Sequence, residues 1–180
     1  MSSRRFVTAV IVATGVLAAR RTAAAQRKPS PDSSRAVRAA DSAFAALQRR
    51  GRLAMGVDQY TSVHRFDKRA DGGRVELQRA RDDSAEIATI RAHLRAIKAA
   101  FERGDFSTPA FVHMRDVPGT EVMAGRRALI RYEVRDLPRG GELLMTTTDS
   151  VARRAIHEFM DFQRSDHRAG SADDHRHPPQ

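Results

Sequence analysis

The chain has 180 residues, and its 32 lysines and arginines outnumber its 22 acidic residues, which gives a formal net charge of +10. It contains no cysteine, which excludes thiolate nucleophiles, disulfide frameworks and cysteine-based zinc sites. The arginines are scattered among acidic residues, and no aromatic side chains interleave with them to stack on bases. The composition therefore argues against a nucleic-acid-binding protein.

The first 25 residues are typical of a secretory signal peptide. Arg4 and Arg5 precede an uncharged apolar run over residues 6–19, and alanines at 23–25 offer a small-residue cleavage site. The run is shorter than the ~20 residues that a spanning helix needs, so we expect no permanent membrane span. The general secretory route is favoured over the twin-arginine route, because Phe6 follows the arginine pair directly. The sequence thus predicts a periplasmic or secreted protein.

The predicted mature chain of 155 residues (180 − 25) is long enough for one domain. Residues 26–34 are expected to be a polar linker. An amphipathic helix then runs to Arg50, and Gly51 is expected to end it. Residues 60–66 and 74–78 alternate in polarity around a turn at 71–73, which predicts a β-hairpin.

The strongest helix signal of the chain begins after Asp83. Glu86 follows three residues later, as in a capping box, and apolar residues recur every three or four positions up to Phe101, before Gly104. We then expect a proline-containing connection, two strands, a third helix and a disordered, histidine-containing tail, over 105–125, 128–134, 142–147, 149–167 and 169–180 respectively.

The predicted domain, residues 35–168, repeats the order strand, Gly-Gly turn, strand, helix. The first glycines of the two turns, Gly72 and Gly140, are 68 residues apart (140 − 72). Each hairpin has one apolar face that a single helix cannot cover. We therefore expect an α+β fold in which two ββα units join into a four-stranded antiparallel sheet, with helices packed on one face and an additional N-terminal helix.

Histidine is the residue type that points most directly to chemistry. Without cysteine, a metal site outside the cytoplasm would use imidazole, carboxylate or thioether ligands, a set suited to copper or zinc. No two histidines have the i, i+4 spacing of a helical metal clamp, so a site would have to join separate elements. The candidate metal ligands come from the first strand, the second helix, the connection and the third helix: His64, His93, His113 and His157.

Each candidate also has a structural interpretation. His64 shares a strand face with Phe66, and His93 flanks an apolar helical stripe, so both suit buried, hydrogen-bonded rings. His157 lies opposite Phe159 on its helix and is expected at the surface unless a partner covers it.

Catalytic signatures are mostly missing. The sequence has no P-loop, no G-x-S-x-G elbow and no complete H-E-x-x-H motif. One alternative is a small hydrolase or transferase with His64 or His113 as general base, which requires one of these rings beside a serine, threonine or aspartate in a concave pocket. A polyanion-binding surface is another alternative.

Several short segments resemble a group of small, uncharacterised exported bacterial proteins: His64 through Gly73, Ile90–Leu94, Gly104–Phe106, Val112–His113, Ile130–Tyr132, Ile156–Phe159 and Asp166–Arg168. The resemblance spans roughly residues 55–170 and implies no established activity. Some members carry the label aspartate carbamoyltransferase. That label implies two α/β domains of ~150 residues each and a Ser-Thr-Arg-Thr loop, and this chain has neither, so we reject it.

Together these features predict an exported, non-enzymatic module of the cell envelope. Its expected ligand is an envelope partner or a divalent metal held by histidines.

Overall fold

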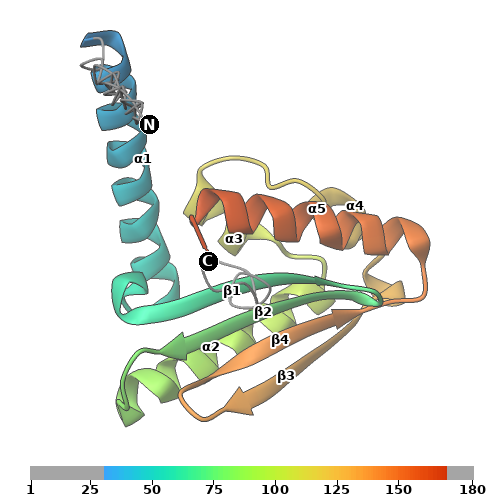
Figure 1. Cartoon of the computed structure of the whole chain (residues 1–180). Helices are drawn as coiled ribbons and strands as arrows, with labels where there is room; N and C mark the ends of the chain where they lie inside the picture. Colours follow the sequence, from blue (N-terminus) through green and yellow to red (C-terminus); the bar gives the residue numbers. More distant parts are fainter. Residues whose placement is uncertain (1–30, 170–180) are drawn as a thin grey trace, which may run out of the picture.

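The computed structural model describes residues 31–169, which form an α+β fold (Figure 1). The predicted signal peptide, most of the predicted linker and nearly all of the predicted tail lie outside these residues. The elements, in chain order, are helix α1 (Pro31–Met55), 3₁₀ helix η1 (Gln59–Thr61), strands β1 (Ser62–Arg69) and β2 (Gly72–Arg79), helices α2 (Ser84–Glu102), α3 (Ser107–His113) and α4 (Thr120–Gly125), 3₁₀ helix η2 (Arg127–Leu129), strands β3 (Arg131–Leu137) and β4 (Gly140–Thr146), and helix α5 (Ser150–Asp166).

The four strands form one antiparallel sheet in the order β1-β2-β4-β3, which confirms the predicted fold class. Helices α2 and α5 pack on the same face of this sheet, because Gly73 faces Ile156 and Met160 of α5 whereas Gly141 faces Leu94 of α2. Neither glycine leaves room for a Cβ atom without a shift of those side chains. The glycines at the two strand starts therefore let the helices approach the sheet closely.

The two ββα units are arranged symmetrically about the sheet centre. Val75 of β2 pairs with Leu143 of β4, and these residues are separated by the repeat spacing of 68 (143 − 75). Equivalent positions of the two halves therefore meet at one point, as a local twofold axis requires. Each helix lies against the hairpin of the other unit, with α5 on β1 and β2 and α2 on β3 and β4 (Figure 1).

Several predicted boundaries were wrong. Helix α1 begins at Pro31, inside the predicted linker, where proline suits the first helical turn. It also continues through Gly51 to Met55, because Gly51 is buried and packing on the domain outweighs the low helix propensity of glycine. The connection after α2 contains two short helices, α3 and α4, which strand and helix periodicity over longer windows could not reveal.

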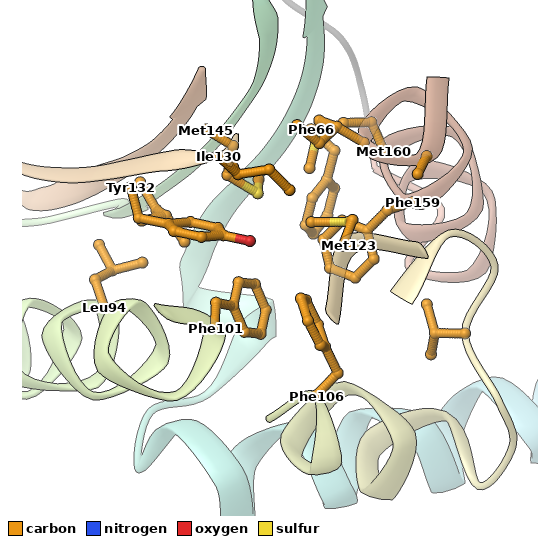
Figure 2. Packing of buried hydrophobic residues seen from close by; sticks show 14 of the residues in the cluster. Phe66, Leu94, Phe101, Phe106, Met123, Ile130, Tyr132, Met145, Phe159 and Met160 are labelled. Atoms are coloured by element: carbon orange, nitrogen blue, oxygen red, sulfur yellow. The ribbon is translucent and has the colours of Figure 1, made fainter. Parts of the chain in front are cut away.

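The caps of the two long core helices explain why their predictions succeeded. The carboxylates of Asp83 and Asp149 each accept a hydrogen bond from the backbone N–H three residues later, at Glu86 and Ala152. Beneath α2 and α5 lies an aromatic core in which the Phe101 and Phe106 rings stack with centroids 4.2 Å apart (Figure 2). Within residues 31–169, no helix is long and apolar enough to cross a membrane.

Candidate functional site: a histidine-lined cavity

A cavity of about 100 Å³ lies between the sheet, α1, α3 and the C-terminal end of α5. Apolar side chains from every one of these elements and from α2 form most of its wall, including Met55, Val75, Leu94, Val112 and Phe159. The polar groups that reach it come from four histidines, one threonine and one glutamine: His64, His93, His113, His167, Thr108 and Gln163. No aspartate, glutamate, lysine or arginine of the described chain lines it.

His64 and His167 face each other across the end of the cavity. Strand β1 places His64 on the helix-covered face beside Phe66, and His167 caps the C-terminus of α5. Their ring centroids are 6.0 Å apart, and the His167 ring also stacks on Phe66 with a centroid distance of 5.4 Å. The His64 Nε2 atom lies 3.0 Å from the Ser62 hydroxyl, which in turn donates to the backbone carbonyl of Asp58.

These imidazoles are uncharged at neutral pH. Burial, and then the neighbouring His93, lowers the pKa of His64 to about 4. Burial, and then the rings of His64 and His113, lowers the pKa of His167 to about 3. Burial also lowers the pKa of His93, although a hydrogen bond with the backbone of Ala54 opposes that shift. The cavity wall therefore presents neutral N–H donors and nitrogen lone pairs rather than charge.

His113 has a different environment from these rings. It ends the short helix α3, and its side chain is almost completely buried. Its Nδ1 atom lies 2.5 Å from a carboxylate oxygen of Asp166, and its Nε2 atom lies 3.1 Å from the amide oxygen of Gln163. Both ring nitrogens therefore face oxygen acceptors. Arg115 donates to the other oxygen of Asp166 at 3.1 Å and so holds that carboxylate in place.

The structure brings three of the four predicted metal ligands to this cavity and leaves one elsewhere. His64, His93 and His113 all line it. His157 lies on the partly exposed side of α5, where its Nε2 atom is 3.0 Å from the carbonyl oxygen of Arg69 at the end of β1. The surface position matches its predicted place opposite Phe159 on the helix.

Sequence reasoning missed His167, Gln163 and Asp166 as members of the site. The helical spacing contained part of the signal, because Ile156, Phe159, Met160, Gln163 and His167 recur every one to four residues on the buried side of α5. A polar residue on such a stripe is a better candidate for a buried site than His157, which is one position off it. The pairing of His113 with Asp166, 53 residues away, follows from no local pattern.

The described residues were also compared with the requirements of a metal centre. In residues 31–169, no group of three or more histidine, aspartate or glutamate side chains is arranged to hold a metal ion. Metal binding by these histidines stays a prediction from the sequence.

The chain was compared with known proteins at three levels. No family model matches it, no curated protein matches it, and no solved structure matches it. Functional inference for this protein therefore depends on the geometry of the cavity.

Proposed function

We propose that this protein is a binding module that holds a small, uncharged, mostly apolar molecule in the histidine-lined cavity. The observation that carries this proposal is the combination of an apolar wall with several neutral imidazoles and no lysine, arginine, aspartate or glutamate. A buried ionic ligand would have no opposite charge to compensate its lost hydration, whereas a neutral polar group can hydrogen-bond to an imidazole.

The cavity volume limits the size of the ligand. An engineered protein cavity of roughly 150 Å³ is known to bind benzene, so a space of about 100 Å³ suits a molecule close to a single five- or six-membered ring. The histidine end favours a molecule that carries one hydroxyl or carbonyl group. We therefore expect phenol and cyclopentanone to be suitable probes.

Ligand-observed NMR on the purified chain at pH 7 would test this proposal. Phenol and cyclopentanone should give saturation-transfer signals, whereas benzoate and cyclopentylammonium, which have similar shapes and a full charge, should give none. Binding of the charged probes as strongly as the neutral ones, or of none of the four, would overturn the proposal.

A matched pair of variants locates the binding. Val75→Phe fills the cavity from β2 and should abolish binding of phenol, because Val75 lines the wall. Val63→Phe adds the same group on the opposite face of the sheet, where the side chain is 42% exposed, and should leave binding unchanged. Equal binding by both variants would place the ligand outside the cavity.

We further propose that the module works in the cell envelope, as the first 25 residues suggest. Those residues lie outside the described structure, so support comes from their sequence alone. N-terminal sequencing of the protein recovered from cells should give a chain that starts at Gln26. Retention of residues 1–25 would contradict this location.

A copper or zinc ion at the cavity histidines remains a second prediction. Neutral imidazole is the form that binds such ions, and His64, His93 and His113 contribute to one cavity. Titration of the purified chain with Zn²⁺ and Cu²⁺ should reveal a site that His64→Gln removes and that deletion of residues 170–180 leaves intact. Loss of all binding with the tail would assign the metal to the tail histidines.

A further inference from the structure

His113 stands in the wall between the buried cavity and a groove at the surface. The groove runs between α1 and the end of α5, and Arg50, Arg115, Asp166 and Arg168 line it together with His113. Asp166 borders the groove and not the cavity. The carboxylate is thus bonded to the buried ring while its negative charge stays outside the apolar space.

This arrangement suits a ring that takes up a proton. A neutral imidazole donates one hydrogen bond, whereas an imidazolium donates two, and His113 has an oxygen acceptor at each nitrogen. Asp166 supplies the counter-charge at 2.5 Å, and Arg115 orients that carboxylate. His64 and His167 are the opposite case, because their surroundings favour the neutral ring.

We propose that His113 acts as a general base on the molecule in the cavity and catalyses enolisation of a small ketone. This inference rests on the proposed binding function. Asp166 is a positioning residue that fixes the His113 proton on Nδ1, so that the Nε2 lone pair lies on the cavity side next to Gln163.

The step balances without any co-reactant. His113 Nε2 accepts a hydrogen from the carbon next to the carbonyl, the electron pair of that C–H bond forms a C=C bond, and the carbonyl π electrons move to oxygen. The imidazolium, stabilised by Asp166, then returns the proton to that oxygen. The product is the neutral enol, and His113 is restored. Thr108, which also lines the cavity, carries a hydroxyl that can donate to the developing oxyanion.

The cavity volume favours this reaction over hydrolysis. A hydrolase would have to hold an ester and an attacking water together, but a ring-sized ketone already fills about 100 Å³. Enolisation needs only the substrate and the base. The same His113–Asp166 pair therefore supports proton transfer better than acyl transfer.

Hydrogen–deuterium exchange tests the inference. Cyclopentanone is incubated with the purified chain in D₂O, and the α-hydrogen signal is followed by proton NMR, because a released enol takes deuterium from the solvent when it returns to the ketone. The wild-type chain should exchange these hydrogens faster than buffer alone, and His113→Gln should lower that rate about 100-fold or more. His157→Gln changes the same residue type outside the cavity and should have no effect.

Two further measurements separate the possible outcomes. Asp166→Asn should lower the exchange rate and alter its pH dependence while the dissociation constant for cyclopentanone stays unchanged, which a purely structural role would not produce. If His113→Gln does not fold, the Asp166→Asn result decides. Binding of cyclopentanone without enzyme-dependent exchange would overturn only the catalytic inference, whereas absence of binding would overturn the proposed function as well.

Discussion

The two ββα halves place different side chains at equivalent positions of one framework. The strand spacing of 68 makes His64 of β1 equivalent to Tyr132 of β3 (132 − 64). The helix caps Asp83 and Asp149 differ by 66, which makes Phe101 of α2 equivalent to His167 of α5. The ring centroids of His64 and His167 are 6.0 Å apart, and those of Tyr132 and Phe101 are also 6.0 Å apart.

One ring pair borders a cavity, and the other closes a core. Tyr132 and Phe101 pack among Phe106, Met123 and Met145 in the aromatic cluster (Figure 2). The comparison shows that this framework needs only well-packed rings at these two positions. The imidazoles of the first hairpin and of α5 are therefore better explained by a site than by the demands of folding.

The largest expected effect comes from making the two ring pairs alike. His64→Tyr combined with His167→Phe should preserve the fold, because the equivalent pair is already accepted, and the added atoms should fill the cavity. Phenol binding should fall below detection in ligand-observed NMR while the circular dichroism spectrum stays unchanged. Retained binding would show that the ligand does not occupy this cavity.

The outer face of the sheet offers the next largest effect. Glu76 and Glu142 are directly opposite on β2 and β4, and Arg74 bridges them at 2.7 and 3.3 Å. Arg74→Met should lower the free energy of unfolding by about 3 kcal/mol, since it leaves two little-exposed carboxylates facing each other. Denaturation by urea would measure this loss. Arg131→Met, at an exposed position of β3, is the control and should cost at most about 0.5 kcal/mol.

The cavity pair should also make stability depend on pH in a way that the aromatic pair cannot. The pKa values of His64 and His167 are about 4 and about 3 in the folded chain, below the unfolded value of 6.5. The unfolded chain therefore binds more protons, so stability is complete above pH 6.5 and falls as the pH drops toward these folded values.

Between pH 7 and pH 5, this linkage should cost on the order of 2 kcal/mol, read from thermal or urea unfolding. The His64→Tyr, His167→Phe double variant should lose less stability over the same range. An identical pH dependence in the two proteins would contradict the neutral state assigned to the two rings.

Tyr132 should give the smallest effect. Its hydroxyl is buried without a hydrogen-bond partner among the described residues and points into the aromatic cluster (Figure 2). Burial also raises the pKa of this phenol above its ordinary value. Tyr132→Phe removes an unsatisfied polar group and should stabilise the chain by about 1 kcal/mol in urea unfolding. A loss of stability would indicate a partner for the hydroxyl.

The sequence predicted most of the fold because its main signals are local. Alternating polarity, the Gly-Gly turns and the caps at Asp83 and Asp149 define the hairpins and core helices within short windows. The end of α1 and the two helices of the connection were missed, because long-range packing determines them.

The candidate site was predicted only in part for a related reason. His64 and His93 could be selected as polar residues on or beside apolar faces. The His113–Asp166 pair and the meeting of His64 with His167 depend on how distant elements pack together, which the spacing of residues along the chain does not encode.

The most direct test of the central claim is the ¹⁵N NMR spectrum of the histidine side chains at pH 6, with and without cyclopentanone. The account predicts one protonated and one unprotonated nitrogen for His64 and for His167, with shifts on addition of the ketone and no change for His157. Imidazolium signals from His64 and His167 at this pH, or unchanged cavity signals at saturating ketone, would contradict it.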